Sequence, residues 1–388
     1  MHTSSKRLLF FFSLVLAVCL LAACASSTSK VTAPPTAQAS QGALTSLKVE
    51  LAPHLDGSGD DLAWQVAPAR VLDATANGIP PFQVTIKSAY DAEKIYFLVQ
   101  YPDLNKDVIR APWAYNAEKK AWERQDDSFG DEDEFGFYWN VNIPNYEVKG
   151  CADLCHDQDP NNKKMYTAKG TWVDIWQFNG ARSLPMGWGR DMRLTDNPDA
   201  DPSGGFVKDE GFDTNSGHAD NVQTLNGVDV PLYWKPFSGV GGVSVGDAVF
   251  LLQSEIDAGY AKKIVSVGDA VFLLQSEIDS GYAKKIVSVG ADGTLTDETG
   301  ASVPAFARIP GRILSAPAGP SWSDIQAVGN WQNGIWTVEF ARKLNTGHAD
   351  DIQFDTAKEY YFDIYIKTRQ AGEQDRQTVS VSKFVFGK

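Results

Sequence analysis

The sequence contains few of the side chains that most often hold metals or carry redox chemistry. Its 388 residues include four cysteines, four methionines and five histidines. A phosphate-binding P-loop and a dinucleotide-binding Gly-x-Gly-x-x-Gly fingerprint are both missing. These absences argue against nucleotide-dependent enzymes. We find no catalytic constellation and therefore expect a non-enzymatic protein.

Basic side chains are also in deficit. Lysine and arginine number 35 against 49 aspartates and glutamates, which gives a formal net charge of −14. Loss of a leader that carries Lys6 and Arg7 makes the mature chain two units more negative. This charge argues against nucleic acid or anionic lipid as a partner. It suits electrostatic steering toward a basic protein, or it is simply a solvated acidic surface.

The chain has one long apolar run, Leu8–Leu21, which follows a short basic segment. A basic start, a short apolar stretch and small residues before a cut site are typical of a secretory leader. The small residues that end in Cys24 resemble the bacterial lipobox. This resemblance implies a signal peptide over residues 1–23, with lipid attached to Cys24, and the following Ala25 and Ser26 favour the periplasmic face of the outer membrane. An ordinary signal peptide or an uncleaved anchor is the alternative.

The part after the leader divides by composition. Residues 24–46 are rich in Ser, Thr, Ala, Pro and Gln and predict a flexible tether. Residues 47–388 are long enough for a large core and predict one domain. Within them, residues 244–265 are repeated almost unchanged at 266–287. This tandem duplication, 244–287, predicts a short helix in each copy, and we expect one copy to pack on the domain.

Beyond the tether the pattern is that of strands. Runs rich in β-branched and aromatic residues alternate with Gly, Pro, Asn and Asp, and long helical periodicities are scarce. We predict an all-β protein, an antiparallel β-sandwich that resembles carbohydrate-binding modules, with long loops and a few short helices. The predicted strands are 84–87, 95–101, 135–141, 172–178, 335–340, 360–366 and 379–386.

The two cysteines that remain in the mature chain, Cys151 and Cys155, are followed directly by His156. The haem attachment signature of c-type cytochromes is C-x-x-C-H, and this segment is one residue longer. Three interpretations stay open: covalent c-type haem on both sulfurs, a disulfide with His156 near or on a non-covalent haem, and a structural disulfide without haem. Zinc is disfavoured, because no second Cys or His pair lies at finger spacing.

A second axial ligand for the iron would come from a small set of side chains. Met165 is the best candidate, because it lies between the Cys–His segment and the next predicted strand. Met186, in a glycine-rich segment, is second. A methionine opposite the histidine raises the reduction potential of a haem. His218 and His348 are alternatives, each of which also fits a solvated loop residue.

Aromatic residues support two different interpretations. Trp176, with its neighbours in the predicted strand, fits the wall of a haem site, although sandwich cores use aromatic residues anyway. The competing class of function is a haem-free module that stacks surface tryptophans on sugars. Such a face would use four other tryptophans: Trp113, Trp122, Trp139 and Trp322.

Two acidic segments suggest calcium. Residues 157–161 place carboxylate and amide oxygens at alternating positions, and residues 56–61 are similarly acidic. Both lack the complete spacing of a calcium loop, so solvated turns are the alternative.

The order of short motifs carries a family resemblance from about Leu47 onward. The early features are Asp56-Gly57, Asp60–Trp64 and Tyr90–Phe97, which resemble the start of carbohydrate-binding-module-like sandwiches. The later landmarks are Gly150–His156, Asp174–Trp176, Arg190-Asp191, Ile309–Gly311, Gly334–Val338 and Arg342–Leu344. Together they resemble the ethylbenzene-dehydrogenase-related haem-binding domain.

This family includes the gamma subunits of ethylbenzene and dimethylsulfide dehydrogenases. The resemblance implies a β-sandwich with one haem that transfers electrons to or from redox partner proteins in the periplasm. The gamma subunits hold a b-type haem with methionine and lysine. The stretch that aligns with the lysine region, residues 372–378, contains neither lysine nor histidine. The gamma subunits in turn lack a Cys–Cys–His cluster.

Overall fold

We describe the protein from a computed structural model. It defines residues 42–76, 79–125, 132–156, 158, 164–209, 218–234, 273–305, 308–315, 321–370 and 373–388. Most of the regular structure is strand, with short helices at α1 (Leu62–Val66), α2 (Tyr146–Leu154) and α4 (Gln275–Asp279). Among these residues, no helix is both long and apolar enough to cross a membrane.

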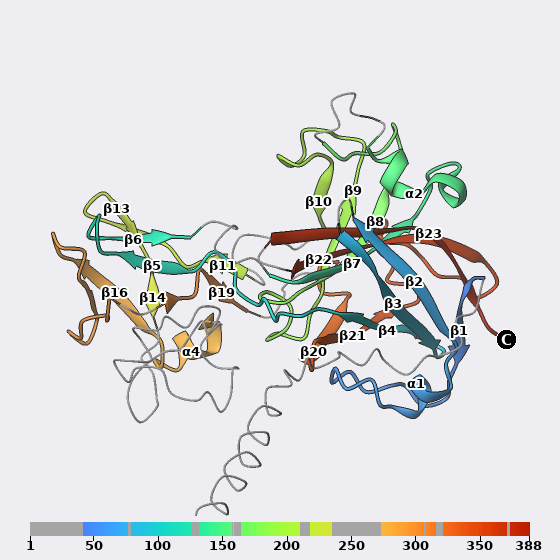
Figure 1. The fold of residues 1–388 in the computed structure, drawn as a ribbon, viewed down its shortest axis with the longest axis horizontal. Helices are drawn as coiled ribbons and strands as arrows, with labels where there is room; N and C mark the ends of the chain where they lie inside the picture. The colour runs from blue at the N-terminus through green and yellow to red at the C-terminus, as the bar shows by residue number, and fades with distance from the viewer. Residues whose placement is uncertain are drawn as a thin grey trace, which may run out of the picture. The chain divides into compact units, whose positions relative to one another are not determined.

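The largest element is a sheet of twelve strands (Figure 1). Hydrogen-bonded neighbours follow one another from edge to edge, and β2 (Ala69–Ala76) pairs with both β23 and β3. The order is β10 (Phe206–Lys208), β9 (Arg190–Leu194), β8 (Val173–Asn179), β7 (Glu134–Asn140), β22 (Glu359–Gln370), β23 (Glu373–Phe386), β1 (Leu44–Lys48), β3 (Ile79–Tyr90), β4 (Lys94–Pro102), β21 (Ile335–Lys343) and β20 (Gln326–Gln332).

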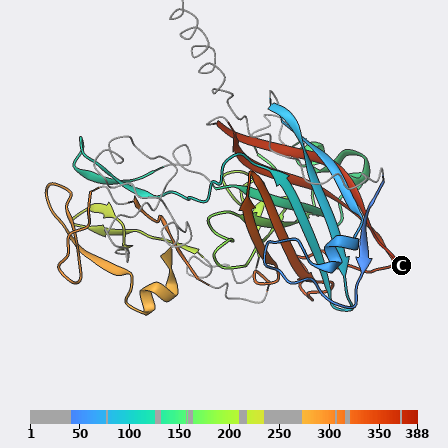
Figure 2. The same ribbon diagram turned by 60° about the horizontal axis from the view of Figure 1, so that its bottom comes forward.

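One strand of this sheet is parallel to its neighbours. The short N-terminal strand β1 lies between β23 and β3 and runs parallel to both. In Figure 2 it is the blue strand beside the red C-terminal ribbon. It begins at Leu44, three residues before the predicted start of the domain. All other pairings in this sheet are antiparallel.

The sheet folds over an aromatic core, so that strands far apart in its order face each other. Phe97 on β4 and Phe137 on β7 have ring centroids 4.9 Å apart, although four strands separate β4 from β7 in the sheet. Phe137 also packs on Phe340 of β21, and Phe97 on Trp176 of β8. Such contacts across the sheet define a sandwich. The predicted fold class is confirmed.

Two backbone hydrogen bonds join segments near opposite ends of the sheet. The amide of Gly189, just before β9, donates to the carbonyl of Ile325, just before β20, at 3.0 Å. The amide of Ala327 donates to the carbonyl of Gly187 at 3.1 Å. Edge strands are exposed to pairing with other chains, and this closure satisfies part of the edge of β20 internally.

Part of what the sequence predicted as long loops forms four small sheets. They contain β5 (Trp113–Asn116) with β6 (Ala121–Arg124) and β18 (Arg308–Ile309); β11 (His218–Asp220) with β19 (Arg312–Leu314) and β15 (Leu273–Leu274); β12 (Gln223–Leu225) with β13 (Val228–Val230); and β14 (Tyr233–Trp234) with β16 (Lys284–Val289) and β17 (Leu295–Asp297). A separate apolar cluster is shared by several of these strands.

The described part of the duplication, residues 273–287, belongs to its second copy. It forms β15, the short helix α4 and most of β16, and the Ile286 side chain is fully buried in the cluster of the small sheets. The first copy, 244–265, lies outside the described residues, as do the leader, Cys24 and most of the tether.

Candidate functional site

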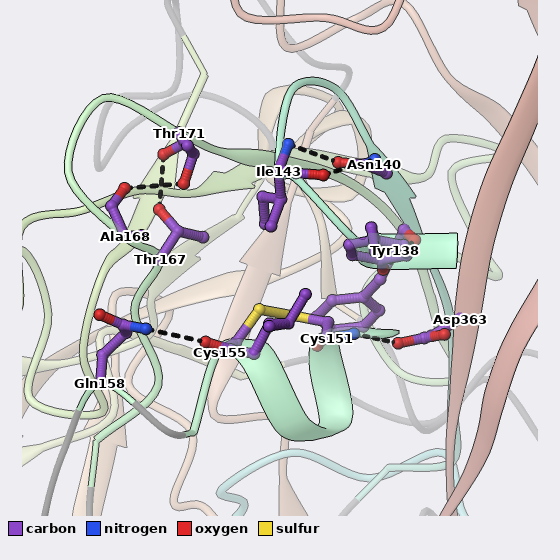
Figure 3. The surroundings of a disulfide bond; sticks show 12 residues. Tyr138, Asn140, Ile143, Cys151, Cys155, Gln158, Thr167, Ala168, Thr171 and Asp363 are labelled. Carbon is purple, nitrogen blue, oxygen red and sulfur yellow. Dashed lines mark hydrogen bonds between the residues drawn. A yellow bond between two sulfur atoms is a disulfide. The ribbon is translucent and has the colours of Figure 1, made fainter. Parts of the chain in front are cut away.

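The Cys–Cys–His segment forms the end of helix α2. Cys151 and Cys155 are joined by a disulfide, with their Cα atoms 4.9 Å apart (Figure 3). The amide of Cys155 donates to the carbonyl of Cys151 at 3.0 Å, so one helical turn closes the bridge. Both side chains are buried. With this pairing neither sulfur is available for a thioether bond to haem.

The segment is fixed to the sheet through a glycine and an aspartate. Gly150 has φ +69°, a conformation that favours glycine, and the next amide, that of Cys151, donates to Asp363 on β22. A Cβ atom at Gly150 would lie 2.7 Å from the nearer carboxylate oxygen of Asp363. The close approach of backbone to carboxylate therefore requires glycine at this position.

The disulfide lies in an apolar cluster between α2 and the sheet. Its buried members come from the loop before α2, from the helix itself, from β8 and from β9: Ile143, Tyr146, Val173, Ile175, Met192 and Leu194. Met165 packs against this cluster while partly exposed. The cluster is a dry, sulfur-containing environment next to the predicted iron ligands.

The backbone segments that carry the two predicted axial ligands lie side by side. The amide of Tyr166 donates to the carbonyl of Cys155 at 3.1 Å. His156 directly follows Cys155 in the chain, and Met165 directly precedes Tyr166. The Nδ1 atom of His156 is buried and has no hydrogen-bond partner among the described residues. The backbone of Met165 is held on its other side, because the amide of Gly205 donates to its carbonyl at 2.7 Å.

Two other predicted haem contacts lie outside this cluster. Met186 is half-buried in the segment that bonds to β20. Trp176 is fully buried in the aromatic core, and its indole Nε1 donates to Asp174 at 3.1 Å. His218 begins strand β11.

The second polar feature was not recognised as a site from the sequence. The side chains of four aspartates, Asp174, Asp191, Asp209 and Asp351, are at most 3 % exposed, and the guanidinium of Arg342 is buried with them. We call these five residues the buried acidic centre. Asp174 is on β8, Asp191 on β9 and Arg342 on β21, whereas the other two follow strands. Three of the positions, Asp174, Asp191 and Arg342, are in motifs of the family resemblance, but nothing local indicates that they meet.

Arg342 organises this centre. Its Nη1 atom lies 2.8 Å from Oδ2 of Asp174, and its Nη2 atom lies 3.1 Å from Oδ2 of Asp351. Nη2 also donates to the carbonyl of Ile352 at 2.9 Å. The guanidinium carbon lies 4.8 Å from the ring centroid of Trp176, a cation–π distance. The arginine therefore links the two layers of the sandwich.

The pKa values reflect the crowding of like charges. Burial raises the pKa of Asp191 well above its ordinary range, and the Asp174 carboxylate raises it further. Burial first, with neighbouring carboxylates, raises the pKa of Asp209 to about 8 and that of Asp351 to about 7. Burial alone would lower the pKa of Arg342, but the three nearest carboxylates raise it instead. The centre thus favours additional positive charge at neutral pH.

A pocket of about 790 Å³ is lined in part by His348, whose Nδ1 atom lies 3.8 Å from Oδ2 of Asp351 in this centre. Its lining includes Trp172, Arg193, His348 and Asp350, and Arg193 Nη1 lies 3.3 Å from Asp350 Oδ2. The Nδ1 atom of His348 lies 2.6 Å from Oδ2 of Asp324, so the carboxylate orients the imidazole. The volume is within the range of small-ligand sites.

The four tryptophans predicted to form a sugar-binding face do not lie on the surface. Trp113, Trp122, Trp139 and Trp322 are at most 4 % exposed, so none of them offers a ring to solvent. Their indoles serve the interior: Trp113 Nε1 donates to the carbonyl of Asn221, and Trp122 Nε1 to that of Gly293. Sequence composition alone does not separate core tryptophans from surface ones.

The acidic segment 56–61 is a turn held by its own hydrogen bonds. Asp56 accepts from the amide of Ser58 at 2.8 Å, and Asp61 accepts from the amide of His54 at 2.9 Å. Glu339 on β21 accepts from the amide of Gly57 at 2.6 Å. Of the other segment suggested for calcium, 157–161, only Gln158 is among the described residues.

Fold and site together define a mostly β protein with a disulfide-closed Cys–Cys–His segment and a buried acidic centre. The sequence profile of the family described as ethylbenzene dehydrogenase matches residues 61–365. The chain belongs to this family, as its motifs predicted. No curated protein matches the chain in a sequence search.

Two solved structures are similar to the chain at 8 % identity. A candidate carbohydrate-binding protein from Bacteroides uniformis covers 89 % of this chain and 99 % of its own, with a TM-score of 0.33. A family 9 carbohydrate-binding module from Caldicellulosiruptor kristjanssonii, in complex with cellotriose, covers 88 % and 92 %, with a TM-score of 0.29. These TM-scores are too low to support any conclusion about this chain.

Proposed function

We propose that this protein binds one haem and carries electrons between redox partner proteins, without being an enzyme itself. Membership of the ethylbenzene dehydrogenase family, which the match of the family profile to residues 61–365 shows, supports the proposal. The observation that carries it is the hydrogen bond from the Tyr166 amide to the Cys155 carbonyl, which places the backbone of Met165 beside that of His156. Imidazole and thioether are a common ligand pair for haem iron.

The donor set fits a non-covalent, b-type haem. The buried Nδ1 atom of His156 lacks a partner within the described part of the chain, which is unusual for a buried polar atom in a satisfied core. Cys151 and Cys155 bond to each other, so attachment would rest on the axial ligands and on apolar contacts. A haem iron supplies one-electron transfer between its ferrous and ferric states.

The chain's own residues would set the properties of this group. The apolar cluster around the disulfide excludes water and lowers the local dielectric, which affects the reduction potential. The bonds of Gly205 and Ser203 to Met165 fix the backbone from which the thioether extends. The strongly negative charge of the chain would direct a basic partner toward it.

A visible spectrum of the full chain, purified from haem-replete cells, tests the proposal. We expect a Soret band that is strongly reduced in His156→Ala. The matched control is His54→Ala, because His54 is solvent-exposed. Met165→Leu keeps the volume but removes the sulfur, so we expect haem to be retained with an altered spin state. A colourless wild type overturns the proposal, and loss of the band only in His348→Ala overturns the ligand assignment.

Extraction into acid acetone separates the two kinds of haem attachment. We expect all haem to be extractable from the wild type, because both sulfurs are used in the disulfide. The double variant Cys151→Ser/Cys155→Ser should be equally extractable. Haem that resists extraction from the wild type but not from the variant establishes thioether attachment instead.

We further infer that the protein is an exported lipoprotein on the periplasmic face of the outer membrane, held by lipid on Cys24. The support is the sequence of the leader, with its apolar run and small residues. Metabolic labelling with a palmitate analogue tests this inference. We expect label in the wild type and none in Cys24→Ala, and an unlabelled wild type contradicts it.

A second candidate function is binding of a small polar ligand in the pocket of about 790 Å³. Trp172, which is partly exposed, lines it together with hydroxyl and charged groups, including Thr171 and Arg193. An aromatic ring beside hydrogen-bonding groups suits sugar recognition. Isothermal titration with cello-oligosaccharides, comparing wild type with Trp172→Ala, tests it. Binding by a colourless protein favours this function over electron transfer.

A further inference from the structure

The charges of the buried acidic centre do not balance. Four carboxylates, from Asp174, Asp191, Asp209 and Asp351, surround the single guanidinium of Arg342. If every group is ionised, the centre carries three excess negative charges away from water. Such an excess is not tolerated in a protein interior unless protons or a cation neutralise it.

Several carboxylate oxygens of this centre have no hydrogen-bond partner among the described residues. Both oxygens of Asp191, whose side chain is fully buried, have no hydrogen-bond partner within the described ranges. The same is true of Asp209, which is 2 % exposed and whose carboxylate lies against that of Asp191. The Oδ1 atom of Asp174 is likewise unsatisfied by any described residue. Buried polar atoms in folded proteins nearly always bind something.

The spacing of the oxygens fits one small ion. Asp174, Asp191 and Asp351 each present an oxygen, and the three oxygens lie within 4.8 Å of one another. Oxygen ligands of Ca²⁺ lie about 2.3–2.6 Å from the ion, so two ligands on opposite sides are about 4.6–5.2 Å apart. The three carboxylates therefore span no more than one coordination sphere.

We propose that Asp174, Asp191 and Asp351 bind one hard divalent cation of the calcium class, with Asp209 as a fourth oxygen donor. All donors are carboxylates, which suits calcium or magnesium better than softer metals. A dipositive ion reduces the excess charge of the centre from three to one. The inference does not depend on haem, because none of these residues belongs to the proposed haem ligands.

The ion would act as a structural link. Asp174 and Asp191 are on neighbouring strands β8 and β9, whereas Asp351 follows β21, in the other half of the sheet order. The amide of Ile352 already donates to Asp174 at 2.8 Å, so the two segments meet at the site. His348, which lines the neighbouring pocket, has its Nδ1 atom 3.8 Å from Oδ2 of Asp351.

The first test measures bound ion and thermal stability on the full chain. We expect elemental analysis to find close to one calcium per chain, and EGTA to lower the melting temperature by several degrees. Added CaCl₂ should restore it, because a ligand that binds only the folded state raises stability. A wild type that binds no calcium or magnesium, and whose melting temperature is insensitive to both, overturns the proposal in favour of protons.

Variants locate the ion. Asp191→Asn keeps the shape of the side chain and removes its charge, so we expect the calcium response to be lost. Asp133→Asn is the matched control: Asp133 is also a buried aspartate, 1 % exposed, but does not belong to this centre, so its response should equal that of the wild type. A full calcium response in Asp191→Asn overturns the assignment of the site.

Terbium gives a readout that does not depend on stability or on variants that fold poorly. The indole of Trp176 donates to Asp174 and would sensitise the luminescence of Tb³⁺ bound beside it. We expect sensitised emission that calcium displaces, and that is strongly reduced in Trp176→Phe while calcium content stays near one per chain. Absence of calcium-displaceable emission from the wild type contradicts the proposal.

Discussion

Replacement of Arg342 by methionine tests how strongly the buried acidic centre depends on its guanidinium. The variant keeps much of the side-chain volume but removes ion pairs to Asp174 at 2.8 Å and to Asp351 at 3.1 Å. It also removes the hydrogen bond to the carbonyl of Ile352 and the contact with the ring of Trp176. All of these interactions are fully buried.

The expected cost follows from what is left behind. Removal of one partner from a buried ion pair leaves an uncompensated charge and destabilises by about 3–5 kcal/mol. Here two carboxylates lose their partner, so we expect Arg342→Met to lower the free energy of unfolding by at least this amount. Lys343→Met is the matched control on the same strand. Lys343 is exposed, and its loss should cost within about 0.5 kcal/mol.

The assay is urea unfolding followed by tryptophan fluorescence, with excess chelator so that bound metal does not contribute. A double-mutant cycle with Asp174→Asn isolates the pair, since removal of both charges should recover part of the loss. If Arg342→Met costs less than about 1 kcal/mol, or no more than Lys343→Met, the reasoning is refuted. The centre would then be neutral without its arginine.

Two further predictions concern other buried carboxylates. Gly150→Ala should destabilise by about 1–3 kcal/mol more than Gly170→Ala, because both have positive φ but only Gly150 faces the Asp363 carboxylate; equal losses in urea unfolding contradict the role of that contact. Burial raises the pKa of Asp133 well above 3.8, so the folded chain keeps a proton that the unfolded chain releases. Stability should therefore fall as pH rises above about 4, by about 1.4 kcal/mol per unit that the pKa is raised. Asp133→Asn should flatten this slope between pH 4 and 8 while its carbonyl still accepts from Trp336, and an unchanged slope refutes the assignment.

The strands were predictable because their signal is local. The predicted runs 84–87 and 95–101 lie inside β3 and β4, and the prediction 135–141 differs from β7 by one residue at each end. Alternating β-branched and aromatic residues report on strand formation wherever the strand goes. The order of strands in the sheet was not predictable, because pairing depends on contacts between distant segments. The parallel insertion of β1 is the clearest case.

One part of the candidate site was likewise predictable from local sequence, and another part was not. Cys151, Cys155 and His156 lie within six residues of the chain and were recognised as a group, whereas the sequence left open whether the two sulfurs form a disulfide or hold haem, and the structure pairs them. The buried acidic centre was missed because its partners are remote: Arg342 bonds to Asp174 across 168 residues. A strand aspartate normally faces solvent, whereas all seven residues of β8 are buried. A sequence pattern cannot report that both faces of a strand are covered.

The pairing of β1 with β23 constrains when the chain can fold. The first strand of the sheet lies against the last, in register from Leu44 opposite Phe384. Vectorial synthesis therefore delivers β1 long before its partner, and the sheet stays open until β23 emerges. A nonsense mutation before β23 would remove a pairing partner from each of β1, β2 and β22 rather than shorten one strand.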